Sequence, residues 1–213
     1  MRCTDACVYP YPLGDSTVRR MAQEAGELGF DSMVAVGARG CTYKGVEVVG
    51  GTIIQGRDQR EVQAAMRRID GNPGILMATA GDYTLNRALL HVGRVRVLQG
   101  IHATPKNSFD HILSKMAAER QVAVDLDLSL LVSGRDYARQ KALQRYADLA
   151  GLQSRFGFPF TLSSGARSIL QMKSTRDMVA LCGLFGLDED GVGGALLGIA
   201  KILRPEKAVE VVE

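Results

Sequence analysis

The sequence predicts an α/β protein, a TIM-like (β/α) barrel of about seven or more parallel strands that is small and irregular for its class. Short apolar runs alternate along the chain with segments whose apolar residues have helical spacing. Repeated strand-then-helix order is typical of parallel β/α units. The 213 residues can bury one full core, and no Pro- or Ser-rich linker divides them. A single domain over residues 1–213 is therefore expected, with an open doubly wound sheet as the alternative.

The predicted strands are apolar over most of their length. A strand of a parallel sheet is covered on both faces, so a continuous apolar run is expected rather than strict alternation. In chain order these runs are Cys3–Val8, Met33–Val36, Val46–Ile54, Ile75–Thr79, Val95–Leu98, Val122–Leu128 and Phe158–Leu162.

The predicted helices place apolar residues at positions i, i+3, i+4 and i+7. Ser16 is a possible cap of the first helix and Ser108 precedes the fourth, while Asp58 with Glu61 resembles a capping box before the second. A similar pattern, Ser174 with Asp177, precedes the sixth. The seven helices are marked by the apolar sets 18/21/22/25, 62/65/66/69, 85/88/89/92, 109/112/113/116, 143/146/147/150, 178/181/182/185 and 192/195/196/199.

Composition excludes several classes of protein. Hydrophobic residues make up 46% of the chain, which is typical of a globular domain. No uncharged run reaches the roughly 18 apolar residues of a membrane span, and the first residues lack a signal-peptide pattern. None of Cys3, Cys7, Cys41 and Cys182 forms a C-x-x-C pair. Free thiols in a reducing compartment, and hence a cytoplasmic location, are expected.

The segment from Phe158 to Leu187 is the most informative about a ligand. A predicted strand ends in the small-residue loop Ser163–Ala166, and cations follow before or at the next helix start. Small residues and cations at the C-terminal end of a strand suit a phosphate-rich ligand. Residues 132–176 carry eight Lys or Arg and only two acids, although the whole chain has a net charge of +3. This asymmetry indicates either an anionic partner or an ordinary solvated helix surface.

The three histidines give weak evidence for catalysis. His91 and His111 fall within helical patterns, where a surface or packing role is the favoured interpretation. His102 follows the fifth predicted strand and is better placed, but a lone loop histidine is more often a hydrogen-bonding residue. A metal-dependent phosphoesterase needs several converging ligands, and no nucleophile motif is present in their stead.

Two acidic residues alternate on one side of a predicted strand. Asp125 and Asp127 are spaced so that both could hold a cation. The favoured interpretation is instead an ion pair with Arg87 or Arg135.

Basic residues are the stronger signal, because they recur in or near the loops and helix starts that follow the predicted strands. Cations there neutralise phosphates and position a nucleic-acid backbone. Only 6% of the residues are aromatic, so base stacking is expected to contribute little. The basic residues therefore fit structured RNA or DNA that is recognised through its shape and backbone. Small phosphorylated metabolites would also satisfy this chemistry. The predicted RNA-binding residues are Arg87, Lys106, Arg135, Arg139, Arg167, Lys173 and Arg176.

A series of short sequence words carries a family resemblance over essentially the whole chain. In this order and spacing they resemble archaeal ribonuclease P protein component 3, the relative of the eukaryotic thirty-kilodalton subunit. The words are Asp5–Pro10, Gly14–Thr17, Met21-Ala22, Gly29–Asp31, Asp82, Asn86–Ala88, Leu126–Leu131 followed by a basic helix, Ser163–Ala166, Arg176-Asp177 and Gly183–Leu187.

The resemblance implies a barrel related to polymerase-and-histidinol-phosphatase domains and an accessory role in a ribonucleoprotein enzyme. In that family the RNA subunit removes 5′ leaders from precursor tRNA, so no catalytic residue and no metal ligand is expected in the protein. Mg²⁺ would be bound with the RNA, and contact with precursor tRNA would be indirect. The expected protein partner is protein component 2, in a heterotetramer with two copies of each, and the isolated chain is expected to be inactive.

Two alternatives remain open from the residues. Hydrolases of the related barrel family have a His-x-His pair after the first strand, whereas this chain has Cys7-Val8-Tyr9. An autonomous metal-dependent phosphoesterase would have to use Asp5, His102, Asp125 and Asp127 as ligands. A small-molecule phosphate-binding enzyme would use Ser163–Ala166 as its phosphate cup.

Overall fold

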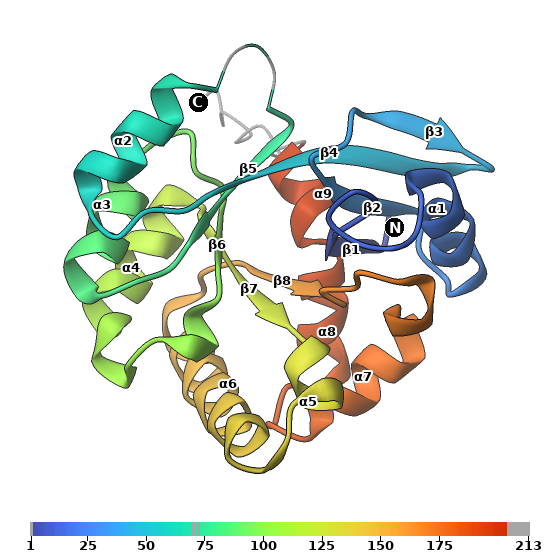
Figure 1. Cartoon of the computed structure of the whole chain (residues 1–213). Helices are drawn as coiled ribbons and strands as arrows, with labels where there is room; N and C mark the ends of the chain where they lie inside the picture. Colours follow the sequence, from blue (N-terminus) through green and yellow to red (C-terminus); the bar gives the residue numbers. More distant parts are fainter. Residues whose placement is uncertain (1, 70, 72, 204–213) are drawn as a thin grey trace, which may run out of the picture.

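Seven parallel strands form a nearly closed barrel in the computed structural model, which describes residues 2–69, 71 and 73–203 (Figure 1). The strand order is β1-β2-β4-β5-β6-β7-β8, and the short strand β3 (Cys41–Tyr43) pairs antiparallel with β4 outside that path. The TIM-like class is thus confirmed, and every predicted apolar run overlaps a strand. The barrel strands are β1 (Thr4–Val8), β2 (Ser32–Val36), β4 (Val46–Ile54), β5 (Ile75–Thr79), β6 (Val97–Gln99), β7 (Ala123–Asp127) and β8 (Phe160–Ser163).

Beyond the ends of β1 and β8, a few backbone contacts bring the barrel close to closure. An isolated parallel bridge joins Val8 to Ala166, and the N–H of Tyr9 donates to the Ala166 carbonyl at 2.8 Å. The N–H of Gly165 donates in turn to the Cys7 carbonyl at 3.2 Å. The loop after β8 is therefore held against the end of β1, at the C-terminal end of the barrel.

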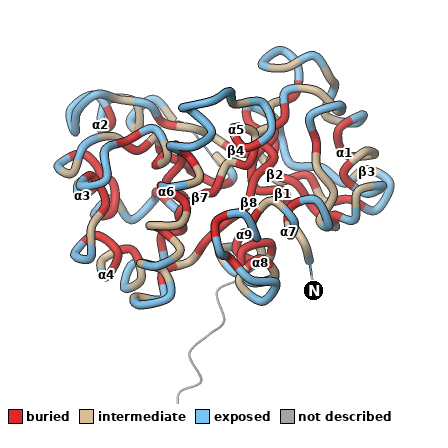
Figure 2. Tube along the Cα trace, turned by 90° about the horizontal axis from the view of Figure 1, so that it is seen from below, coloured by how far each residue is buried: buried red, intermediate tan, exposed pale blue. Residues whose placement is uncertain are grey.

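Helices surround the strands and turn their buried faces inward (Figures 1 and 2). In chain order they are α1 (Val18–Glu27), α2 (Gln59–Arg67), α3 (Tyr83–His91), α4 (His111–Arg120), α5 (Ser129–Ser133), α6 (Asp136–Phe156), α7 (Thr175–Gly183), α8 (Glu189–Leu196) and α9 (Gly198–Leu203), with 3₁₀ turns η1 (Ile101–Ala103), η2 (Lys106–Ser108) and η3 (Ile169–Gln171). Within the described residues, none of these helices combines the length and the hydropathy that a membrane span requires.

Several predicted helix boundaries were wrong. Thr17 rather than Ser16 caps α1, because Thr17 accepts a hydrogen bond from a backbone N–H of the first turn. The cap of α4 is Asp110, two residues after the Ser108 that was expected to precede the helix. The short helix α5 was not predicted. The last predicted helix is two helices, α8 and α9, and residues 1, 70, 72 and 204–213 of the predicted single domain lie outside the described part.

The interior of the barrel changes character along its axis. Toward the N-terminal ends of the strands it is apolar, with Ile75, Val97 and Ala123 in one cluster. Ile199 of α9 joins this cluster, so the terminal helix closes that end. Gly198 permits the close approach, because a Cβ there would lie 2.3 Å from the Phe160 carbonyl oxygen. Polar side chains of the interior begin at mid-strand, with Asp125 at the centre of β7, and continue to the strand ends, with Ser163 as the last residue of β8.

Candidate functional site

Asp125 is the centre of a buried hydrogen-bonded group inside the barrel. Thr161 Oγ1 donates to Asp125 Oδ1 at 2.9 Å, and Ser163 Oγ donates to Oδ2 at 2.6 Å. All three side chains point inward because strands alternate their faces and β7 and β8 are adjacent. Burial, with a smaller contribution from the nearby charge of Asp127, raises the pKa of Asp125 to about 8. Both carboxyl oxygens are occupied, and the group is mostly protonated at neutral pH.

Asp5 forms a second buried group with the loop after β8. The backbone N–H of Ser164 donates to Asp5 Oδ1 at 3.0 Å, and Ser164 Oγ donates to Oδ2 at 2.6 Å. Burial raises the pKa of Asp5 to about 6, although the Ser164 hydrogen bonds oppose the shift. The remaining N–H groups of the predicted phosphate cup are also occupied, because Gly165 donates to Cys7 and Ala166 to Ser164 Oγ. The phosphate-cup interpretation is therefore wrong, because the chain's own groups already satisfy these donors.

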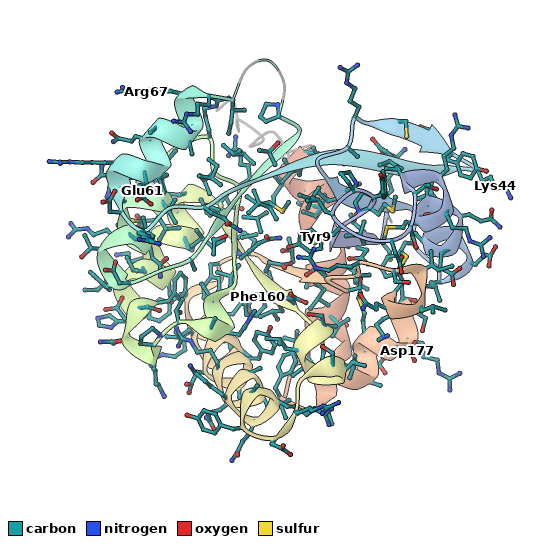
Figure 3. The ribbon with its side chains drawn as sticks, in the orientation of Figure 1. Tyr9, Lys44, Glu61, Arg67, Phe160 and Asp177 are labelled. Atoms are coloured by element: carbon teal, nitrogen blue, oxygen red, sulfur yellow. The ribbon has the colours of Figure 1, made fainter. Side chains whose placement is uncertain are left out.

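The end of β1 carries Cys7 and Tyr9, and burial raises the pKa of both side chains. The Cys7 side chain is therefore a thiol rather than a thiolate. The guanidinium of Arg167 lies 4.3 Å from the centre of the Tyr9 ring and donates to the Leu13 carbonyl at 2.9 Å. Tyr9 is labelled in Figure 3, toward the middle of the ring of strands. This pair covers part of the barrel mouth.

His102 has a defined hydrogen-bonding role. Tyr146 Oη donates its single proton to the Asp127 carbonyl at 2.7 Å, so His102 Nδ1, 3.1 Å from the same oxygen, must act as the donor to it. Burial lowers the pKa of His102, which favours the neutral ring. His102 therefore fixes the η1 segment against α6, as expected for a hydrogen-bonding residue.

Asp127 is only partly buried, and its carboxylate accepts a hydrogen bond from the Ser129 N–H at 2.9 Å. No ion pair joins Asp125 or Asp127 to Arg87 or Arg135 within the described residues, so that expectation was wrong. Hydroxyl and backbone donors on adjacent elements meet the acceptors of these two carboxyl groups instead.

Three of the predicted RNA-binding residues are exposed, and their side chains make no hydrogen bond or ion pair with other described residues. Arg87 lies on α3, Arg135 stands at the N-cap position of α6, and Arg176 lies in the first turn of α7. The first turn of α7 is held by a capping box between Ser174 and Asp177, the latter labelled in Figure 3. All three helices begin on the side of the barrel where the strands end, so Arg135 and Arg176, which stand at helix starts, lie on that side, whereas Arg87 lies in the middle of α3.

The other four predicted residues have partners in the chain. Lys106 pairs with Asp148 at 2.8 Å, Arg139 donates to the Val132 carbonyl at 3.1 Å, and Lys173 donates to the Gln171 carbonyl at 3.0 Å. Arg167 is the fourth, through its contacts with Leu13 and Tyr9 described above. A carbonyl partner leaves the positive charge uncompensated, so the cationic character of this end persists. RNA contact by any of the seven stays a prediction.

One basic residue of unusual environment was not singled out from the sequence. Arg145 is 4% exposed on α6, and its guanidinium nitrogens have no hydrogen-bond partner among the described residues. It occupies a position of the buried stripe Ala142, Arg145, Tyr146 and Leu149. A cation in the apolar stripe of an amphipathic helix was the available signal.

The sequence from residue 2 to residue 208 matches the family described as RNase P subunit p30. The chain is 27% identical over 195 residues to "Ribonuclease P protein component 3" of Methanococcoides burtonii, an alignment that covers 87% of this chain and 80% of that protein. Four relatives of the same name, from Methanothermobacter thermautotrophicus and strains of Methanococcus maripaludis, align over 57–59% of their own lengths, less than two thirds.

Two solved structures share the fold. A chain in a cryo-EM structure of archaeal ribonuclease P with mature tRNA superposes with a TM-score of 0.77 at 17% identity, covering 98% of this chain and 96% of that one. Histidinol phosphate phosphatase of Lactococcus lactis, in complex with zinc, L-histidinol and phosphate, gives a TM-score of 0.55 at 11% identity, covering 87% and 94%. At these identities the likeness concerns the fold alone.

The residues of this chain do not fit a metal centre of the kind that the phosphatase holds. Among the described residues, no three His, Cys, Asp or Glu side chains are placed to hold a metal ion. The oxygens of Asp5 and Asp125 already accept hydrogen bonds from serine and threonine groups, and Cys7 carries a protonated thiol. A protonated or internally bonded donor is a poor ligand, because binding requires the free, deprotonated form.

Proposed function

The chain belongs to the RNase P subunit p30 family and is a protein component of ribonuclease P, a tRNA-processing ribonucleoprotein, and from this premise we propose that it binds and stabilises the RNA subunit. In this role the protein neutralises close-packed phosphates, so that the RNA folds and cleaves 5′ leaders at lower Mg²⁺. Catalysis belongs to the RNA and its Mg²⁺ ions, and the isolated protein is inactive. A cytoplasmic location is part of this proposal.

The observation that carries the proposal is a set of exposed cations, two of which stand at helix starts on the side of the barrel where the strands end. The side chains of Arg87, Arg135 and Arg176 have no hydrogen bond or ion pair in the described part of the chain, so forming a phosphate contact breaks no internal interaction. An autonomous phosphoesterase receives no comparable support, because its candidate carboxyl groups are committed to buried hydrogen bonds.

The proposed partners are the ribonuclease P RNA and protein component 2, in a heterotetramer with two copies of each protein. Precursor tRNA is contacted indirectly, through the RNA subunit. Two observations support these assignments: the family to which the chain belongs, and the likeness of its fold to a chain in archaeal ribonuclease P bound to mature tRNA.

Reconstitution tests the proposal directly. Precursor-tRNA cleavage by the ribonuclease P RNA is measured at limiting Mg²⁺, with and without this protein and protein component 2. A large gain that needs both proteins is expected. If omission of this protein leaves cleavage unchanged, while the RNA and its partner are competent by themselves, the proposal fails.

The salt dependence of RNA binding tests the cations one at a time. Arg176→Ala is expected to weaken binding and to reduce the slope of log affinity against log salt by about one, because one phosphate loses its counter-charge. Lys173→Ala is expected to have the same effect, because the carbonyls to which its ammonium donates leave the positive charge uncompensated. Unchanged slopes for Arg176→Ala would reassign that residue to the helix start.

A further inference from the structure

Arg145 is a buried cation whose hydrogen-bonding capacity is unused. It lies midway along α6, is 4% exposed, and none of its three guanidinium nitrogens has an acceptor among the described residues. A guanidinium presents five N–H donors in a rigid plane and keeps its charge even when it is buried. Such a group is costly to bury alone, so its environment indicates an acceptor that comes from outside the chain.

The surroundings of Arg145 form a pocket of about 510 Å³ between α6 and the loop after β6. Lys106 from that loop and Lys141 from α6 line it together with Arg145. Its single acidic lining residue, Asp148, already holds Lys106 at 2.8 Å. The pocket therefore has an excess of positive charge, and its chemistry suits an anion that can accept from a planar fork.

The ion pair in the lining of this pocket is weakly held. The Lys106 side chain is 77% exposed, and an ion pair so accessible to water contributes little to stability. An anion entering the pocket can take Lys106 away from Asp148 and gain a second cation. Tyr137, also a lining residue and 76% exposed, offers a bare ring at the rim on which a base can stack.

We propose that this pocket binds a phosphate of an RNA backbone, with Arg145 as its main donor, Lys106 and Lys141 beside it and Tyr137 against an adjacent base. The inference rests on the proposed function and names a binding site for it. RNA is favoured over a carboxylate of a protein partner, because the pocket gathers three cations, Lys106, Lys141 and Arg145, against one acid, and has the exposed ring of Tyr137 at its rim. A single carboxylate would compensate one of these charges and leave the ring unused, whereas an RNA backbone brings several phosphates with a base beside them.

The test is RNA binding by Arg145→Met in the full chain, with Arg155→Met as the matched control. Arg155 is an exposed arginine near the C-terminal end of the same helix. Affinity for the ribonuclease P RNA is measured over a range of salt concentrations, together with thermal unfolding of the free proteins. Arg145→Met is expected to bind the RNA roughly ten- to one-hundred-fold more weakly, because charge-assisted hydrogen bonds are lost. The slope of its log affinity against log salt concentration is expected to be smaller in magnitude by about one.

The melting temperature of the free protein is an independent measurement, and it is not expected to fall with the RNA affinity. Replacing an unpaired buried charge with methionine is expected to leave the melting temperature unchanged or to raise it. Should Arg145→Met prove unstable, Lys141→Met decides, because this exposed residue can be changed without disturbing the core. It is expected to lower the salt slope by about one while the melting temperature stays constant.

Three results would overturn the inference. Wild-type affinity in both Arg145→Met and Lys141→Met would remove the pocket from the RNA interface while the proposed function stood. If the same two variants bound RNA with wild-type affinity but bound protein component 2 more weakly, the pocket would be assigned to a protein carboxylate. Absence of RNA binding by the wild-type chain, with no gain in reconstituted cleavage, would remove the proposed function as well.

Discussion

The barrel interior and the α6 pocket both bury ionisable side chains, but only the interior satisfies them. Asp125 receives donors from Thr161 and Ser163, and Asp5 receives two from Ser164. Arg145 has none among the described residues, although it is almost as deeply buried. The interior polar group thus acts as a structural element, and the pocket as a site that is incomplete until a partner binds.

The difference shows how to separate a structural polar group from a binding one in a barrel. The position at the strand ends, where barrel enzymes place their chemistry, would have favoured the interior. The hydrogen bonds argue against the interior as a binding site, because polar groups that already satisfy one another have no donor or acceptor left for a ligand. Three predictions test this comparison, and for the substitutions the expected loss of stability runs from large to small.

Asp125→Ala is expected to have the largest effect. It leaves the hydroxyls of Thr161 and Ser163 without an acceptor and opens a small cavity, for a loss of about 3 kcal/mol of unfolding free energy. Asp125→Asn, which keeps the shape and can still bond both hydroxyls, is expected to cost less than about 1 kcal/mol. Urea unfolding measures both. Equal stability of Asp125→Ala and wild type would mean that the interior group is not structural.

The pH dependence of stability should follow the same group. The pKa of Asp125 is about 8 in the folded chain, against about 4 when unfolded. Between those values the folded state holds the proton more tightly, so stability falls as pH rises from about 4 to about 8 and levels off above. Asp5, with a pKa of about 6, adds to the same trend at lower pH. Asp125→Asn should flatten the change in urea midpoint between pH 5 and pH 9; a slope as steep as that of the wild type would refute this assignment.

Asp148→Asn sharpens the other side of the comparison and should have the smallest effect. In the structure Asp148 accepts a hydrogen bond from the exposed Lys106 and acts on Arg145 only through its charge, so its loss is expected to cost less than about 1 kcal/mol. If Asp148 were instead the partner of Arg145, the change would strand a buried charge and cost about 3 kcal/mol or more. Thermal unfolding of Asp148→Asn beside Lys106→Met, which breaks the same pair from its exposed end, separates the two cases.

The strand and helix order was predictable because it follows from the local spacing of apolar residues along the chain. The run Val46–Ile54 and the capping box of Ser174 and Asp177 came out as predicted. The cap of α1 did not, since Ser16 and Thr17 are both good capping residues and only the chain path chooses between them. The ion pair expected for Asp125 also failed, because pairing across strands depends on neighbours that sequence spacing does not reveal.

The sequence by itself determined the barrel class, the family and the clustering of cations in residues 132–176, because periodicity, motif order and composition are properties of the chain. Only the tertiary structure decided which polar groups are satisfied. Asp5 meets Ser164 across 159 positions, and the pocket around Arg145 is completed by Lys106 from another element. Hydrogen-bond partners are set by closure of the barrel and by packing of α6 on it. Ionisable side chains are therefore satisfied inside the barrel but left with unused donors in the pocket around Arg145.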